Sequence, residues 1–382
     1  MSAARKQMRV FYDAKRPPRG HWLRLAITCV LVRLSAVAAE PGKLCFSSRA
    51  DEHSFTGVWS PGPPEGDSWN DCEHSAVIIK PHLCDVRHPQ FQKLNRTLDD
   101  RFDATSCWLP PMNYQAFVGL IGPNRTLWYV GDSIMRQMFE AQVCAFARFR
   151  PTERPWGMSH VEWMEDKVHQ TASKLLEKEE KFHHKHPTQP ADTGHFVSRC
   201  VTLVDGTRIC HLWTTHAEEL MDILQVIGRN PREYVVTNFG LHKNSLPHNS
   251  ETLKDQLLRW SAMCADGDCA RLVWRETSPQ HFQTPGGLFD EALNNKVCAP
   301  HTAEHAALAN KYNIESRSVL LQFESPLFHV LPVWAVAAEK WNFHASDCTH
   351  WCLPGMPDLW LRMLYSMMKA RSEGAVEQPR SV

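Results

Sequence analysis

Residues 126–133 read TLWYVGDS, and this stretch decides the fold that we expect. Residues 126–130 form a short apolar run of the kind found in strands that are buried on both faces of a parallel sheet. Gly-Asp-Ser follows at residues 131–133, and residues 134–147 then have the pattern of a helix. A strand that turns directly into a helix is the first half of a βαβ unit, so the stretch predicts an α/β fold.

The chain after this stretch continues to alternate between strands and helices. We expect further strands at residues 234–237, 271–274 and 318–322, and helices at residues 218–227, 253–263, 304–311 and 357–368. Such alternation predicts a parallel sheet that helices cover on both faces. We assign this α/β domain to residues 116–372 and treat the polar, His- and Lys-rich residues 151–192 as an insertion in it. The cluster at His183, His184 and His186 could bind a metal, but a charged surface segment is the simpler interpretation.

The two ends of the chain differ from this domain. Residues 1–24 hold seven basic side chains and one acidic one, a net charge of +6, and residues 25–39 are apolar except for Arg33. A basic leader followed by a short apolar run is typical of a secretory signal, either cleaved or kept as a type II signal-anchor. Residues 40–115 are rich in Cys, Pro, His and Trp and predict a loop-rich segment held by disulfides, whereas residues 373–382 read as a flexible tail.

Cysteine content and net charge narrow the class of protein further. The chain has 13 cysteines, and leaving out Cys29 in the apolar leader gives 12, an even number that favours disulfides in an oxidising compartment. The spacings do not form paired CxxC sets, so a zinc site is the weaker interpretation. Lys and Arg together number 42 and so do Asp and Glu, a balance that gives no electrostatic reason to expect nucleic-acid binding.

Ser133 stands where an α/β fold exposes a side chain to ligands. It follows a strand and opens a helix, where free backbone N–H groups and the helix dipole favour a developing oxyanion. Ser133 could also simply cap the helix, because Ser is common in that role. A serine nucleophile needs a base, and Asp347 stands three residues before His350 near the other end of the chain. That spacing can place the carboxylate against the imidazole, which would then take the serine proton.

These blocks resemble the trichome-birefringence-like family of polysaccharide O-acetyltransferases, within the wider SGNH/GDSL hydrolase superfamily. The first block is VGDS at residues 130–133 with Arg136, and the closest likeness is DCTHWCLPG at residues 347–355 with Pro357, Asp358 and Trp360. Between these two blocks, Arg275 with SP at residues 278–279 and HF at residues 281–282 is similar to a further family segment. SCWLP at residues 106–110 resembles the segment that precedes the first block in the family.

The resemblance implies a fold, a mechanism and a location. The fold would be a three-layer α/β/α sandwich with a parallel sheet, and the location the Golgi lumen, with the chain anchored or secreted. Ser133, His350 and Asp347 would form a catalytic triad that carries acetyl as an acetyl-serine. The oxyanion donors would be the backbone N–H of Ser133 together with Asn238 and Gly240. An acetyl donor of unknown identity would be a co-substrate, with no tightly bound cofactor and no metal.

Three further residues are candidates for binding the glycan or polysaccharide acceptor. Arg136 could contact substrate or serve as a structural ion-pair partner. Arg275 ends a predicted strand and could bind acceptor hydroxyls or an acidic sugar. His281 lies close to that segment in sequence, although a structural histidine is the alternative. After Asn238 the family usually shows Thr-Gly-His-Trp-Trp, whereas residues 239–243 read FGLHK, so the plant cell-wall acceptors of the family do not carry over.

The residues leave three functions open. The first is transfer of acetyl to a glycan hydroxyl, and the second is removal of acetyl by water with the same triad. The third is a catalytically silent glycan-binding protein of the secretory lumen, which the intact Ser133, Asp347 and His350 disfavour. The sequence leaves the oligomeric state undetermined.

Overall fold

The computed structural model describes residues 43–61, 100–146, 199–215, 217–241, 249–290, 293, 297–302, 310–320, 325–345 and 347–374. All of them belong to one compact unit of the chain, Ala38–Val382. The predicted leader, the insertion at residues 151–192 with its histidine cluster, and most of the predicted tail lie outside the described residues. No helix within the described ranges is long and apolar enough to cross a membrane.

A six-stranded sheet forms the centre of the domain, in the order β4-β5-β3-β6-β7-β8. Its strands are β3 (Thr126–Gly131), β4 (Arg199–Thr202), β5 (Arg208–Trp213), β6 (Tyr234–Asn238), β7 (Arg271–Arg275) and β8 (Phe328–Leu331). The pairs β5·β3, β3·β6, β6·β7 and β7·β8 are parallel, and β4 is antiparallel to β5. The predicted strands at residues 126–130, 234–237 and 271–274 are confirmed. The antiparallel edge strand β4 makes the sheet mixed, not wholly parallel as we expected.

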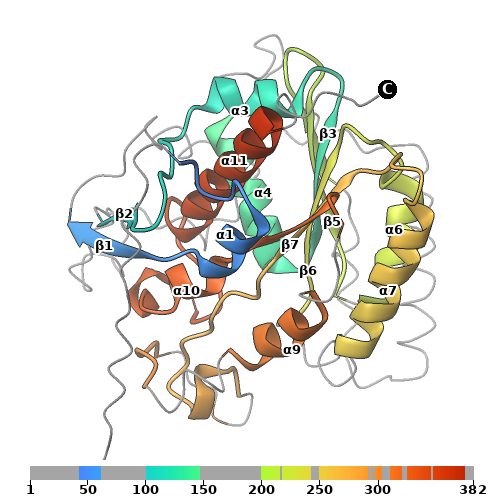
Figure 1. Ribbon diagram of the computed structural model, residues 1–382. Helices are drawn as coiled ribbons and strands as arrows, with labels where there is room; N and C mark the ends of the chain where they lie inside the picture. The colour runs from blue at the N-terminus through green and yellow to red at the C-terminus, as the bar shows by residue number, and fades with distance from the viewer. Residues whose placement is uncertain are drawn as a thin grey trace, which may run out of the picture. The chain divides into compact units, whose positions relative to one another are not determined.

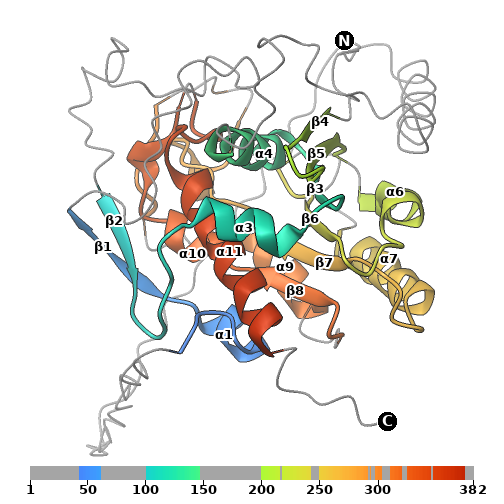
Figure 2. The ribbon, with the colours of Figure 1, turned by 90° about the horizontal axis from the view of Figure 1, so that it is seen from above.

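Helices cover both faces of the sheet, as predicted (Figures 1 and 2). The helices α3 (Tyr114–Ile121), α4 (Ser133–Ala145) and α11 (Met356–Gly374) lie on one face. The helices α6 (Leu220–Ile227) and α7 (Asn249–Met263) lie on the other, and α9 (Lys311–Leu320) packs against α7. The three-layer α/β/α architecture is therefore confirmed.

The side chains of β3 show how its sequence builds these layers. Leu127 and Tyr129 belong to the hydrophobic cluster beneath α4 and α11, whereas Trp128 and Val130 belong to the cluster beneath α6 and α7. Successive side chains of a strand point to opposite faces, so a continuous apolar run serves both layers at once. This is why residues 126–130 lack the polar alternation of a half-exposed strand.

One predicted strand is wrong. Residues 318–322 were expected to form a strand, but α9 runs through Leu320, and β8 begins eight residues later at Phe328. The buried face of α9 includes Asn313 and Ser316 beside Val319 and Leu320. Asn313 exchanges hydrogen bonds with the backbone of Thr277, donating to its carbonyl and accepting from its N–H. Because polar side chains occupy part of the buried face, the apolar periodicity of a helix is hidden in the sequence.

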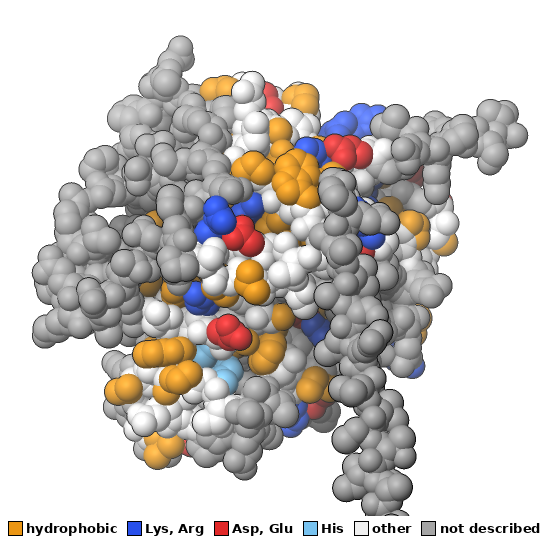
Figure 3. Space-filling model, turned by 60° about the vertical axis from the view of Figure 1, so that its left-hand side comes forward, with side chains coloured by type: hydrophobic (Ala, Val, Ile, Leu, Met, Phe, Trp, Pro, Cys, Tyr) orange, Lys and Arg blue, Asp and Glu red, His pale blue; other side chains and the backbone are white. Residues whose placement is uncertain are grey.

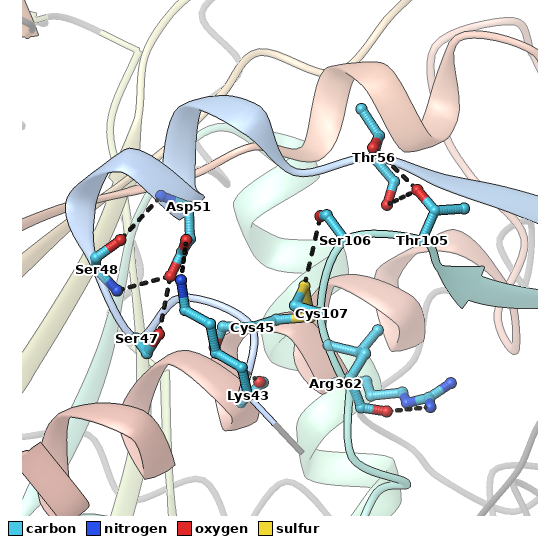
Figure 4. Close-up of a disulfide and its surroundings, with 12 residues drawn as sticks. Lys43, Cys45, Ser47, Ser48, Asp51, Thr56, Thr105, Ser106, Cys107 and Arg362 are labelled. Atoms are coloured by element: carbon cyan, nitrogen blue, oxygen red, sulfur yellow. Dashed lines mark hydrogen bonds and ion pairs between the residues drawn. A yellow bond between two sulfur atoms is a disulfide. The ribbon is translucent and has the colours of Figure 1, made fainter. Parts of the chain in front are cut away.

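The N-terminal segment is disulfide-bonded as predicted, but it is not only loop. It contains helix α1 (Arg49–Ser54) and an antiparallel pair of strands, β1 (Gly57–Pro61) and β2 (Asp100–Ala104). Ser48 caps α1 in a capping box with Asp51, and the Cys45–Cys107 disulfide holds the start of this segment (Figure 4). Arg362 of α11 donates to the carbonyls of Leu109 and Pro110, which fixes the same segment against the α/β domain.

The predicted disulfide framework is confirmed within the described residues. The bonds are Cys45–Cys107, Cys200–Cys210, Cys264–Cys269 and Cys298–Cys348, and Cys144 and Cys352 are also disulfide-bonded. Cys29, Cys72 and Cys84 lie outside the described residues. A chain stabilised in this way is suited to an oxidising compartment.

Candidate active site

Ser133, His350 and Asp347 form a continuous hydrogen-bonded line at the carboxyl edge of the sheet. The Ser133 Oγ lies 2.8 Å from His350 Nε2, and His350 Nδ1 lies 2.8 Å from Asp347 Oδ2. The side chains of His350 and Asp347 are 22% and 32% exposed, so the line reaches solvent. The geometry lets the imidazole accept the serine proton on one nitrogen while the carboxylate binds the other.

The end of β3 places Ser133 at this edge. Gly131 has a φ of +151°, and a Cβ at this residue would approach both the Asn238 carbonyl oxygen and the Met135 side chain to 2.6 Å. The position therefore requires glycine. Asp132 then caps α4, accepting from the Ile134 N–H at 2.9 Å, so that the helix starts at Ser133.

Strand order explains why the site forms there. Counted along the chain, the five parallel strands have the spatial order 2-1-3-4-5. The chain runs from β3 to β5 on one side of β3 and then crosses over to β6 on the other side. In open α/β sheets, ligands bind at such a switch point, beyond the carboxyl ends of the strands. Gly131 pairs with Asn238 across it, which brings the ends of β3 and β6 together.

The loop at residues 347–351 carries both the imidazole of His350 and the carboxylate of Asp347. Asp347 Oδ1 accepts from the backbone N–H groups of Thr349 at 2.8 Å and of His350 at 2.7 Å, which leaves Oδ2 for the imidazole. The Cys298–Cys348 disulfide fixes this loop to the segment at residues 297–302. Burial raises the pKa of Asp347, but the hydrogen bonds from His350 and Thr349 outweigh it and hold the pKa well below its usual value. The carboxylate is therefore ionised at neutral pH.

The predicted oxyanion donors gather at this edge, and one of them already has partners. The backbone N–H of Ser133 lies in the first turn of α4, where N–H groups lack helical acceptors. Asn238 is fully buried, and its Nδ2 donates to the Arg275 carbonyl at 2.7 Å and to Thr277 Oγ1 at 3.2 Å. Donation to an oxyanion would require Asn238 to give up one of these bonds, and the one to Thr277 is longer. Gly240 follows β6, and a Cβ there would meet Thr277 Oγ1 at 2.4 Å.

Arg275 lies inside the protein and does not face an acceptor. It is fully buried, donates from one terminal nitrogen to Asn238 Oδ1 at 3.1 Å, and lies over the ring of Trp360. Burial lowers its pKa to about 10, and the carboxylates of Asp132 and Glu276 offset part of that effect. The prediction that Arg275 binds acceptor hydroxyls is therefore corrected, because a buried guanidinium cannot contact a sugar; it orients Asn238 instead.

Arg136 and His281 also have internal partners. Arg136 lies 3.5 Å from the buried carboxylate of Glu140 and over the ring of Trp213, which agrees with the ion-pair alternative. His281 is fully buried, with Nε2 2.9 Å from the Ala338 carbonyl and Nδ1 2.7 Å from His344 Nε2. Burial lowers the pKa of His281 to about 4, so the ring is neutral at neutral pH. The placement of His281 among the substrate-binding residues is corrected to a structural role.

Two residues that contact the 347–351 loop were missed from the sequence. His344 Nδ1 lies 3.1 Å from the His350 carbonyl oxygen, and Gln137 of α4 hydrogen-bonds to the backbone of Trp351. Gln137 stands four residues after Ser133, a spacing that places both on one helix face, so the sequence did contain this signal. His344 follows no predicted element, and only the tertiary structure brings it to the loop. Within the described ranges, no three His, Cys, Asp or Glu side chains gather in a group that could hold a metal ion.

Comparisons with known proteins confirm the resemblance that the motifs predicted. Residues 329–367, which include Asp347 and His350, match the PC-esterase family, described as a GDSL/SGNH-like acyl-esterase family found in Pmr5 and Cas1p. The chain is 23% identical over 324 residues to protein trichome birefringence-like 39 of Arabidopsis thaliana, covering 76% of this chain and 83% of that one. It is 24% identical over 133 residues to probable xylan O-acetyltransferase 11 of Oryza sativa subsp. japonica, covering 29% and 33% of the two chains. Over 30 residues it is 53% identical to xylan O-acetyltransferase 2 of the same plant, covering 8% and 6%.

Proposed function

We propose that this protein transfers acetyl groups to hydroxyls of a glycan or polysaccharide through an acetyl-serine at Ser133. The observation that carries the proposal is the hydrogen-bonded line from Ser133 Oγ through His350 to Asp347. The family match supports it, because the matched segment contains both Asp347 and His350. Relatives named xylan O-acetyltransferase support a polysaccharide acceptor.

The first half of the reaction acylates the enzyme. His350 Nε2 takes the Ser133 proton while Oγ attacks the carbonyl carbon of an acetyl donor. The tetrahedral intermediate carries a negative oxygen, which the Ser133 N–H and a second donor near Gly240 would stabilise. When the intermediate collapses, His350 returns its proton to the leaving group of the donor, and Ser133 keeps the acetyl group as an ester.

The second half of the reaction uses an acceptor hydroxyl in place of the leaving group. His350 Nε2 takes the hydroxyl proton while the sugar oxygen attacks the acetyl-serine carbonyl. Collapse of the second intermediate releases the acetylated sugar, and Ser133 Oγ regains its proton from His350. In both halves the ionised Asp347 holds His350 with Nδ1–H toward the carboxylate and stabilises the transient imidazolium.

An exposed aromatic side chain beside the 347–351 loop supports an acceptor that has sugar rings. Phe289 is 48% exposed, and its backbone N–H donates to Gln280 Oε1, whose Nε2 donates to Thr349 Oγ1. Hydrophobic side chains also lie beside histidine and acidic side chains on the face drawn in Figure 3. An aromatic face can pack on the C–H groups of a sugar ring. The acceptor differs from those of the family's plant members, because the aromatic residues they carry after Asn238 are absent here.

The location we propose is the secretory lumen. The disulfides of the described residues favour an oxidising compartment, and the basic leader with its apolar run supports entry by a signal or a signal-anchor.

Hydrolysis of acetyl esters is a second candidate, favoured by the acyl-esterase description of the matched family. The same triad serves it, with water in place of the acceptor hydroxyl. An assay can distinguish the two activities: the purified protein, produced in an oxidising host, is given an acetyl donor and a panel of glycans. Acetyl gained by a glycan in mass spectrometry, and lost in both Ser133→Ala and His350→Ala, establishes the transferase. Release of acetate alone, with no glycan modified, establishes the esterase and contradicts our proposal.

A further inference from the structure

We infer that Gln137 is a positioning residue that locks the loop carrying His350 onto the helix carrying Ser133. The inference deepens the proposed function and rests on it, because it concerns how those two side chains are held in register. Gln137 itself touches neither of the reacting atoms.

The contact is a pair of hydrogen bonds between one side chain and one backbone residue. Gln137 Nε2 donates to the Trp351 carbonyl at 2.7 Å, and the Trp351 N–H donates to Gln137 Oε1 at 3.0 Å. A backbone N–H can only donate and a carbonyl can only accept, so the orientation of the amide is fixed. Two bonds to the same residue fix both its distance from α4 and its rotation.

The position of this contact couples it to the proposed nucleophile and base. Ser133 and Gln137 are four residues apart on α4, and therefore on one face of it. Their partners, His350 and Trp351, are adjacent in the loop. The bond of 2.8 Å between Ser133 Oγ and His350 Nε2 and the Gln137 pair thus connect the same two elements side by side.

Burial makes the contact obligatory. Gln137 and Trp351 are both fully buried, so water cannot replace the amide. On its other side Trp351 stacks on His344, with ring centroids 4.0 Å apart. Removing the amide would leave a buried N–H and a buried C=O of the loop without partners, which favours movement of the loop away from α4.

The first test removes the hydrogen bonds while keeping the shape of the side chain. Gln137→Met should lower kcat for acetyl transfer on the order of 10²-fold, the effect of misplacing reacting groups by about 1 Å. KM for the acceptor should stay within about twofold, because the contact is with the loop and not with substrate.

A matched control lies on the same helix. Gln142 is also fully buried, and its Oε1 accepts a hydrogen bond from the Tyr129 hydroxyl, but it stands nine residues from Ser133. Gln142→Met removes the same amide from the same helix and should lower the melting temperature while leaving kcat within about twofold. An equal loss of kcat in both variants would show that kcat depends on any buried amide of α4, and it would overturn the positioning role of Gln137.

A conservative variant gives a readout that a general loss of stability would not produce. A protonated glutamic acid has one donor and one acceptor, like the glutamine amide, whereas its ionised form has acceptors only. The activity of Gln137→Glu, as a ratio to wild type, should therefore be highest at low pH and fall as pH rises. The other titratable side chains named at this site, His344, His350, Asp347 and Asp132, are present in both proteins, so a pH trend in the ratio has its origin in the residue at position 137. A flat ratio would contradict the inference.

Labelling of Ser133 by a fluorophosphonate separates this inference from the proposed function. In that reaction Oγ bonds to phosphorus, fluoride leaves and His350 takes the proton, so it reports the Ser133–His350 pair without an acetyl donor or acceptor. We expect fast labelling of wild type and Gln142→Met, and labelling slowed on the order of 10²-fold in Gln137→Met. Labelling of the wild type and Gln137→Met at equal rates overturns the inference while leaving Ser133 as nucleophile. No labelling of the wild type overturns the nucleophile itself and the inference with it.

Discussion

The two carboxylate oxygens of Asp347 have different partners, and each has its own part in the site. One carboxylate oxygen accepts from two backbone N–H groups of its own loop, and the other faces His350. The side chain therefore both shapes the loop and selects the tautomer of the base. An acid three residues before a histidine is a weak signal in sequence. In the structure, however, both carboxylate oxygens of Asp347 have hydrogen-bond partners in the same loop.

Asp347→Asn should lower the rate of acetyl transfer about 10³–10⁴-fold with little change in melting temperature. The oxygen of the new amide can still accept from the loop, but its NH₂ would face His350 Nδ1. The ring would then carry its proton on Nε2 and could not accept the proton of Ser133. Asp103→Asn, which breaks an exposed pair with Arg101 in β2, is the control and should leave the rate unchanged. Steady-state kinetics check both, and a loss under tenfold for Asp347→Asn would contradict its role.

At the residue scale the sequence predicted the three groups that the structure joins by hydrogen bonds, but not the partners that hold them. Ser133, His350 and Asp347 were predicted because their types and spacing match a known chemistry. Arg275 was predicted to bind acceptor hydroxyls or an acidic sugar because it ends a predicted strand, and the structure buries it completely. Its partners, among them Asn238 and the ring of Trp360, come together only in the folded chain and are encoded by no local pattern.

Among the elements, α11 has an unusual first turn. Its Asp358 is 7% exposed and accepts from the Gly355 N–H at 2.7 Å. Burial raises the pKa of Asp358 to about 8, although the hydrogen bond from Gly355 opposes the rise. The folded protein thus holds a proton on Asp358 that the unfolded chain releases near pH 4.

This difference predicts a pH dependence of stability. Because the folded state binds the proton more tightly, the contribution of Asp358 is fully present below about pH 4 and is lost as pH rises toward about 8. Asp358→Asn keeps the acceptor and cannot ionise, so its melting temperature should exceed that of wild type at pH 8, with the gap closing toward pH 4. Asp255→Asn on the exposed surface of α7 should show no such trend. A constant gap for Asp358→Asn across this range would contradict the prediction, and thermal melts at several pH values decide it.

The elements also show where sequence periodicity stops being informative. Strands β3, β6 and β7 were predicted because both faces of each are apolar. Strand β5 was missed because His211 interrupts its apolar run, yet that side chain is 2% exposed. Helix α9 was mistaken for a strand because Asn313 and Ser316 lie on its buried face. In each case a buried polar side chain interrupted the apolar pattern that the sequence would otherwise show.

For the molecule as a whole, disulfides connect the site to its surroundings. Cys298–Cys348 closes a separation of 50 residues directly beside His350, whereas Cys264–Cys269 closes a separation of 5 at the far end of α7. The first bond constrains more of the unfolded chain and also the loop that carries the base.

Removing the two bonds should therefore have different effects. The double variant Cys298→Ser/Cys348→Ser should lose roughly 4 kcal/mol of stability, by the loop-entropy relation, and also lower kcat at least tenfold. Cys264→Ser/Cys269→Ser should lose less stability and keep its kcat. Denaturant unfolding and steady-state kinetics give both quantities. Unchanged kcat in the first variant at a temperature where it stays folded would show that the disulfide does not position the loop.

The strand order 2-1-3-4-5 was not predicted from the sequence. Alternating strands and helices fix the class of fold but leave the order open, since many orders satisfy the same local patterns. It is this order that brings the end of β3, carrying Ser133, next to the end of β6. The meeting of Ser133 with the loop near the C-terminus is therefore a property of the whole molecule.

The most direct test of acetyl transfer through Ser133 is a search for the acetyl group on that residue. The protein would be mixed with an acetyl donor in the absence of acceptor, quenched with acid and digested, and the peptide containing Ser133 weighed by mass spectrometry. We predict one added acetyl group on Ser133, which disappears when a competent glycan is supplied before the quench and never forms in His350→Ala. Acetyl transfer to a glycan at the wild-type rate with Ser133→Ala would contradict the account.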